Sequence, residues 1–155
     1  MIWISTSRLS WLYACHTDEL PGPPLKQNVT GRWAGTPPSF FTYAMEKTDA
    51  RGLLEFTRAT GALIRSMIAC RRPIVAALNG TVAGAGAVIA AACDIRIAAP
   101  SAKIAFLFTK VGLSGADMGA SWLLPRIVGL GRATEMLMTG DFLDADSAER
   151  IGLYS

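Results

Sequence analysis

The sequence has few of the residues that build metal centres, disulfide frameworks or nucleic-acid interfaces. Its 155 residues include one histidine, His16, and three cysteines, Cys15, Cys70 and Cys93. Because an odd number of widely spaced cysteines forms neither a disulfide framework nor a zinc pattern, we predict no metal site. A reducing cytoplasmic location is the default expectation. The basic residues give a net charge of +3 but are scattered along the chain, which predicts no nucleic-acid partner.

Charge is absent from one stretch, Ile74–Cys93, and about 20 apolar residues suffice to cross a membrane. The interior of this stretch contains Asn79-Gly80, followed by Gly84 and Gly86. An Asn-Gly pair followed by spaced glycines is typical of a strand, a turn and the start of a helix. We therefore predict that this stretch belongs to a folded core and that the protein has no membrane partner.

The composition of the chain changes near residue 45. Residues 19–39 are rich in proline and glycine without a sustained period, which predicts loop or disorder. Beyond them, helical and strand-like segments alternate, which favours an α/β layer arrangement. We expect helices from an N-cap at Thr48 or Asp49 to a point before Pro73, and at 85–92, 120–128, 132–138 and 145–151. We expect strands at 74–78, 94–98 and 103–108, and a glycine-rich loop at 112–119.

The first motif with chemical potential is Gly84-Ala85-Gly86, which follows a predicted strand and opens a predicted helix. Without side chains at the glycines, a ligand can approach the free N–H groups of a helix N-terminus, which favour negative charge. Such a corner suits a phosphate or the oxyanion of an enolised thioester. Close packing of helix on strand also explains the glycines, and the motif alone favours that explanation.

The second motif is Asp117, a carboxylate in the glycine-rich loop just before the apolar segment that begins at Ala120. It could cap the following helix, since aspartate is a preferred N-cap residue. It could instead transfer a proton in a reaction. The local sequence favours the cap.

Taken together, the two motifs resemble those of the enoyl-CoA hydratase/isomerase (crotonase) family. The run from Pro73 to Asp94 resembles the family signature A-x-N-G-x-x-x-G-G-G and the helix after it. The later runs G-L-x-x-x-D-x-G-x-S-W-L-L-P-R-I-V-G and A-x-E-M-L-M-T-G resemble the second active-site loop. This resemblance begins near Asp49. It implies a crotonase-like α/β fold of repeated β-β-α units, here incomplete, an acyl-CoA thioester as substrate, and no cofactor. For intact members it also implies homotrimers or hexamers and a role in fatty acid or lipid metabolism.

The resemblance also implies roles for individual residues. The backbone N–H of Ala85 matches a donor of the family's oxyanion hole, and Gly84 and Gly86 would border the substrate. Val88 and Phe108 stand where hydratases of the family carry their two glutamates. Asp117 falls where double-bond isomerases carry an aspartate. We therefore expect a catalytic Asp117 and an enoyl-CoA isomerase, with a 2-enoyl-CoA hydratase and a catalytically inactive fragment as alternatives.

The N-terminal third departs from the family pattern. Members supply the other oxyanion donor from a Gly-Gly-Asp-type loop, whereas residues 32–41 read Arg-Trp-Ala-Gly-Thr-Pro-Pro-Ser-Phe-Phe. We expect residues 1–45 to be an atypical segment, either disordered or misassigned through a frame change or a wrong start. We expect residues 46–155 to form a partial crotonase-like domain, truncated at both ends.

Overall fold

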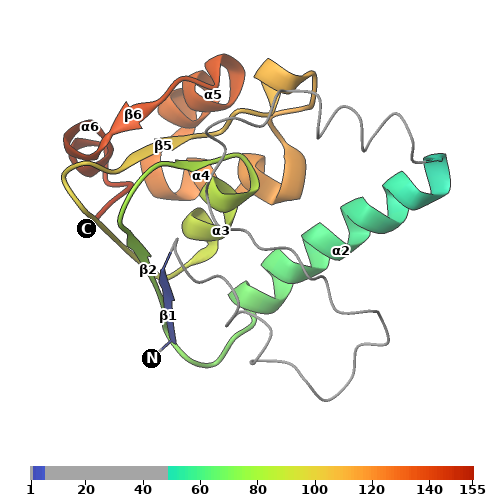
Figure 1. Ribbon diagram of the computed structural model, residues 1–155, viewed down its shortest axis with the longest axis horizontal. Helices are drawn as coiled ribbons and strands as arrows, with labels where there is room; N and C mark the ends of the chain where they lie inside the picture. The colour runs from blue at the N-terminus through green and yellow to red at the C-terminus, as the bar shows by residue number, and fades with distance from the viewer. Residues whose placement is uncertain (1, 6–48) are drawn as a thin grey trace.

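The computed structural model describes residues 2–5 and 49–155 (Figure 1). Its longest helix, α2 (Ala50–Ile68), begins where the Asp49 side chain accepts a hydrogen bond of 2.8 Å from the backbone N–H of Gly52. An aspartate in this role satisfies one of the free N–H groups of the first helical turn. The helix ends before Pro73, as predicted. Figure 1 shows its N-terminal end extending away from the rest of the fold.

The first sheet contains three parallel strands, with β2 (Ile74–Leu78) between β1 (Ile2–Ser5) and β4 (Ile95–Ala98). Parallel sheets are usually covered on both faces, so a central strand reads as a continuous apolar run. The β2 sequence Ile-Val-Ala-Ala-Leu fits this rule, and four of its five residues are buried. The predictions for 74–78 and 94–98 are confirmed within one residue.

Strand β1 falls inside the range 1–45, for which we expected an atypical segment. Its four residues pair with β2 in register, Ile2 opposite Ile74 and Ser5 opposite Ala77. Over these four residues the chain forms a strand and is not disordered, whereas the expected misassignment stays untested. The remaining residues of that range lie outside the described part of the chain, so the expectation stays untested for them.

The second sheet is smaller and carries the turn into the next helix. Strand β3 (Val82–Ala83) pairs in parallel with β5 (Lys103–Ala105), which pairs antiparallel with β6 (Leu143–Asp144). Helix α3 (Ala85–Ala92) follows β3 directly. Chain order therefore gives β2-β3-α3 and then β4-β5 before the next helix, which confirms the predicted β-β-α repetition.

The predicted strand 103–108 is wrong over its last three residues. Ile104, Phe106 and Phe108 alternate as a strand would, and all three are buried. After Ala105, however, the chain bends into the 3-10 helix η2 (Thr109–Val111), closed by a bond of 3.2 Å from Val111 N–H to the carbonyl of Phe108. Burial of the two phenylalanines on a bend produces the same alternation that a strand produces.

Three helices complete the described chain: α4 (Ala120–Val128), α5 (Leu130–Thr139) and α6 (Ala145–Arg150). Gly129, with φ of 82°, separates the first two, as predicted, although α5 begins two residues before the expected start. Asp144 caps α6 by accepting a 2.8 Å bond from the N–H of Ser147. This hydrogen bonding lowers the pKa of Asp144.

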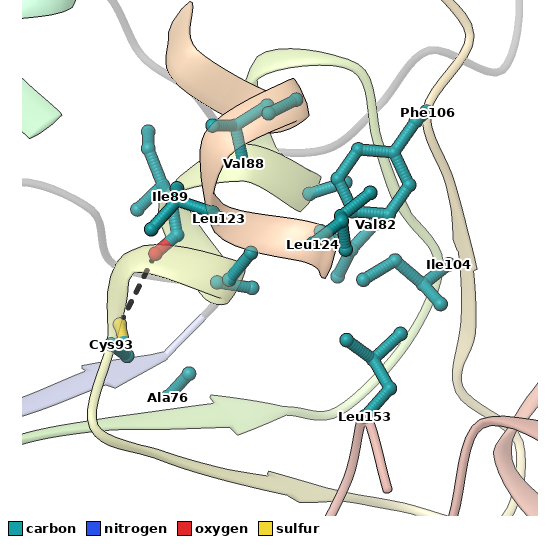
Figure 2. Packing of buried hydrophobic residues seen from close by; sticks show 14 of the residues in the cluster. Ala76, Val82, Val88, Ile89, Cys93, Ile104, Phe106, Leu123, Leu124 and Leu153 are labelled. Carbon is teal, nitrogen blue, oxygen red and sulfur yellow. Dashed lines mark hydrogen bonds between the residues drawn. The ribbon is translucent and has the colours of Figure 1, made fainter. Parts of the chain in front are cut away.

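The core lies between α3, α4 and the two sheets. Figure 2 shows Val88 and Ile89 of α3 beside Leu123 and Leu124 of α4, with Phe106 close to them. The uncharged stretch 74–93 contains the predicted strand 74–78 and the predicted helix 85–92, together with a second short strand, β3, where only a turn was predicted. Among the described residues, no helix combines the length and the apolar character that a membrane crossing needs.

Candidate active site

Gly84 forms the sharp corner between β3 and α3. Its φ of 57° and ψ of −124° belong to a region that residues with a side chain rarely adopt. Its N–H donates to the carbonyl of Ala105 at 3.0 Å, and its own carbonyl accepts from the N–H groups of Ala87 and Val88. The first bond ties the corner to β5, and the other two start the helix.

Crowding does not explain the glycines of this corner. Among the described residues, a Cβ built on Gly84 would meet no atom within 4 Å, and one on Gly86 would reach only ordinary contact, 3.4 Å from Val82. Gly84 is therefore required by its backbone angles, and no residue of the described chain crowds it. Close packing, which the motif alone favoured, does not account for this pair.

Ala85, the first residue of α3, is exposed. Its N–H lies in the first helical turn, where the helix has no carbonyl to accept it. No other backbone carbonyl among residues 2–5 and 49–155 accepts it either. An accessible N–H at the positive end of a helix can stabilise a developing negative charge on an oxygen.

Asp117 begins a 3-10 helix, η3 (Asp117–Gly119), directly before α4. It is not the N-cap of α4, because Gly119 occupies that position and no side chain caps the helix. Two successive left-handed residues, Met118 with φ of 52° and Gly119 with φ of 84°, separate the carboxylate from the first turn of α4. The Asp117 carboxylate instead accepts a 2.9 Å bond from the N–H of Met118. The cap favoured by the local sequence is therefore wrong.

A groove of about 710 Å³ opens between α2, the loop before α4, and α4 itself. Its walls are mainly apolar, and half-buried Asp117 is their only carboxylate among the described residues. The lining residues are Leu53, Phe56, Thr57, Gly61, Ile64, Arg65, Ile68, Leu113, Ser114, Ala116, Asp117, Met118, Gly119, Trp122 and Leu123. The volume lies in the range of small-molecule sites.

The structure places the predicted site residues on neighbouring elements. η3, which carries Asp117, lies against both α2 and α3. Ala85, at the first turn of α3, is not among the residues that line the groove. Asp117 therefore belongs to the groove wall, and Ala85 belongs to the corner formed with Gly84 and Gly86.

Val88 and Phe108 lie in the hydrophobic core and line no part of the groove. Val88 is 0% exposed, and Figure 2 shows it packed near Leu123. Neither side chain can take up or release a proton. The described part of the site therefore has one groove-lining carboxylate and no carboxylate at these two positions.

Arg96 supports the far end of α3, and we did not predict this from the sequence. Its buried guanidinium donates to the carbonyl of Leu153 at 2.7 Å, to that of Ala91 at 3.4 Å, and to that of Cys93. Burial lowers the pKa of Arg96. A cation at the C-terminus of a helix satisfies its free carbonyls and complements its dipole. The only indication of this role in the sequence was that a single arginine interrupts the apolar run Ile-Arg-Ile-Ala.

Thiol chemistry has little support in the described residues. The thiol of Cys93 is buried and donates to the carbonyl of Ile89 at 3.3 Å. Burial raises its pKa to about 12, so the reactive thiolate is scarce near neutral pH. The neighbouring pair Cys15 and His16 lies outside the described residues.

Comparison with known proteins identifies the class. The sequence model of the enoyl-CoA hydratase/isomerase family matches residues 44–155. The chain belongs to this family, and its described fold is the corresponding α/β crotonase-like fold in partial form.

Individual relatives agree with this assignment. The chain is 40% identical over 121 residues to the enoyl-CoA hydratase ACTT3 of Alternaria alternata, which covers 75% of this chain and 40% of that protein. A structure assigned as an enoyl-CoA hydratase of Streptomyces coelicolor A3(2) superposes with a TM-score of 0.73 at 54% identity, covering 77% of this chain and 43% of that one. An enoyl-CoA hydratase of Thermoplasma volcanium GSS1 gives 0.68 at 27% identity, covering 74% and 46%. The chain thus spans less than half the length of these relatives.

Proposed function

We propose that the protein moves a double bond within an enoyl-CoA thioester through an enolate. The Ala85 N–H stabilises the enolate oxygen, Asp117 carries the proton, and Gly84 and Gly86 border the thioester. The acyl-CoA is the substrate, and no further cofactor takes part. The observation that carries this proposal is that Asp117 is the only carboxylate lining the groove within residues 49–155.

The reaction needs only one proton carrier. The carboxylate of Asp117 removes a proton from C2 of a 3-enoyl thioester, and the electrons of that C–H bond form a dienolate whose oxygen accepts the Ala85 hydrogen bond. The same carboxyl group then gives its proton to C4. The C3–C4 double bond becomes a C2–C3 double bond, and atoms and charge balance without a water molecule.

Water addition places a different demand on the site. A water molecule that attacks C3 needs one group to activate it and another to deliver a proton to C2. At the positions that match the two hydratase glutamates, Val88 and Phe108 are buried in the core. This contrast supports isomerisation over hydration.

Two other functions remain candidates, each on its own observation. A 2-enoyl-CoA hydratase is favoured by the names of the relatives, among them the Alternaria alternata and Streptomyces coelicolor proteins. A catalytically inactive fragment is the other alternative, and the match spans 40% of the length of the first of these relatives. A trimer or hexamer and a cytoplasmic location also belong to the proposal, and size-exclusion chromatography tests the assembly.

A panel of 3-enoyl- and 2-enoyl-CoAs with mass-spectrometric detection separates the three functions. Isomerisation converts a 3-enoyl-CoA into a conjugated product of the same mass, whereas hydration of a 2-enoyl-CoA raises the mass by one water. We expect the first result. The second result would establish the hydratase, and no conversion of either substrate would establish the inactive fragment.

The variant Asp117→Asn tests the proton carrier. It keeps the shape of the side chain but cannot take up a proton, so we expect the isomerisation rate to fall by about 10²–10⁴-fold, the usual contribution of a general acid–base group. Asp146→Asn, at an exposed position in α6, is the matched control and should keep the wild-type rate. Full activity of Asp117→Asn would refute the role of Asp117.

A further inference from the structure

Trp122 differs from its neighbours in α4. Leu123 and Leu124 are buried in the core, whereas Trp122 remains 50% exposed. Trp122 and Leu123 both line the groove. Phe56 of α2 lines the same groove. A large aromatic ring at the wall of an apolar groove offers contact area to a ligand at a small cost in side-chain entropy.

Arg126 holds this ring from the next helical turn. Its guanidinium carbon lies 4.0 Å from the centre of the Trp122 ring, and its Nη1 donates a 2.6 Å bond to the Trp122 carbonyl. Residues four apart share one helix face, and a cation over an indole face is attracted to it. Arg126 is not among the residues that line the groove, so its effect on a ligand passes through Trp122.

The chemistry of the groove defines what Trp122 would contact. Its only ionisable lining residues within the described chain are Arg65 and Asp117. The remaining wall is dominated by apolar side chains, including Ile64, Ile68 and Met118. In such a wall each added methylene of a ligand should tighten binding by about fourfold while it continues to find apolar contacts.

We infer that Trp122 is a specificity-determining residue that selects acyl-CoA thioesters with long apolar acyl groups, and that Arg126 is the residue that positions its ring. This inference rests on the proposed function, because it places the acyl group in the groove that Asp117 lines. An acyl group too short to reach the indole would gain nothing from it.

The test uses saturated straight-chain acyl-CoAs, from butanoyl- to dodecanoyl-CoA, and measures their dissociation constants by titration calorimetry. Affinity should rise by about fourfold per methylene in the wild-type protein until the groove is filled. Trp122→Ala should lose this gain for the longer chains and keep the affinity for butanoyl-CoA. Trp122→Phe should restore most of the gain, and Arg126→Gln should lose part of it.

Two control variants distinguish the loss of the Trp122 contact with the ligand from a general effect on folding. Leu130→Ala removes a 72% exposed side chain outside the groove lining, and Arg132→Gln removes an exposed arginine from α5. Both should keep the wild-type dependence on chain length. If Trp122→Ala and Trp122→Phe also keep it, Trp122 is not the selecting wall, and if Arg126→Gln keeps it, Arg126 does not position the ring.

Saturated ligands keep this test independent of the proposed reaction. They have no double bond to move, so their binding does not require Asp117 to carry a proton. If the protein binds them with the Trp122-dependent pattern but converts no enoyl-CoA, the role of Trp122 in selecting chain length is supported and the proposed isomerase activity is refuted. If the protein converts 3-enoyl-CoA and Trp122→Ala leaves the chain-length dependence unchanged, the isomerase activity is supported and the role of Trp122 is refuted.

Discussion

The glycine corner, Gly84–Gly86, and the loop that carries Asp117 offer different kinds of functional group. The corner presents a backbone N–H, held by the Gly84 bond to Ala105 and by packing of α3 in the core. The loop presents a side chain, on a short 3-10 helix that contains a methionine with positive φ. A site built from backbone should tolerate changes of side chain, whereas the loop depends on one carboxylate.

Among the variants that test this comparison, Ala85→Pro should have the largest effect on the reaction rate. Proline has no N–H and suits the first position of a helix, so this variant removes the donor with little change to α3. If the donor stabilises the enolate, kcat should fall by about 10²–10³-fold, as for loss of one oxyanion-hole donor. Steady-state kinetics with a 3-enoyl-CoA measures the loss.

The matched variant is Ala85→Ser, which changes the side chain and keeps the N–H. A rate close to wild type is expected, because the exposed alanine side chain contributes only its methyl group. Equal losses in the two variants would show that the side chain, and not the backbone, is what matters at this position. Circular dichroism checks that both remain folded.

The second prediction concerns Arg96, which supports the corner from the opposite end of α3. Arg96→Met fills a similar volume but leaves the carbonyls of Leu153, Cys93 and Ala91 without this donor. Because an unsatisfied buried acceptor costs about 1–3 kcal/mol, the free energy of unfolding should fall by roughly 3 kcal/mol or more in urea titration. Arg132→Met is the exposed control. A loss equal to that of the control would contradict this account of the corner.

The third and smallest effect compares two glycines. Both Gly84 and Gly119 have positive φ and room for a Cβ among residues 49–155, so an alanine strains the backbone without a clash with these residues. Gly119 lies in the ordinary left-handed region, where the penalty should be about 1 kcal/mol. Gly84 lies outside it, so Gly84→Ala should cost more, up to about 3 kcal/mol. Urea titration of the two variants measures the difference in unfolding free energy. A larger loss for Gly119→Ala than for Gly84→Ala would contradict the view that the backbone at Gly84 is the more strained for a residue with a side chain.

The sequence was informative about the corner for a physical reason. Local signals determine it: an apolar strand, a glycine turn and a run of alanines follow within 20 residues. The bounds of β2, α3 and α4 were therefore predictable from periodicity and from the glycines. The cap of α6 at Asp144 was predictable in the same way.

The loop was less predictable because its conformation depends on residues distant in sequence. Local rules made Asp117 an N-cap and extended the strand through Phe108, and both predictions were wrong. The positive φ of Met118 and the bend after Ala105 place side chains in a core shared with α2 and α3. The groove and the contact between Arg96 and Leu153 likewise join segments far apart in the chain.

The central claim is that the Ala85 N–H and the Asp117 carboxylate act on the same thioester. Exchange of hydrogen for deuterium at C2 of a 3-enoyl-CoA, followed in D₂O by mass spectrometry, tests it most directly, since it reports formation of the enolate itself. We predict rapid exchange with the wild-type protein and with Ala85→Ser, and loss of exchange with both Asp117→Asn and Ala85→Pro. Undiminished exchange in either of the last two variants would contradict the claim.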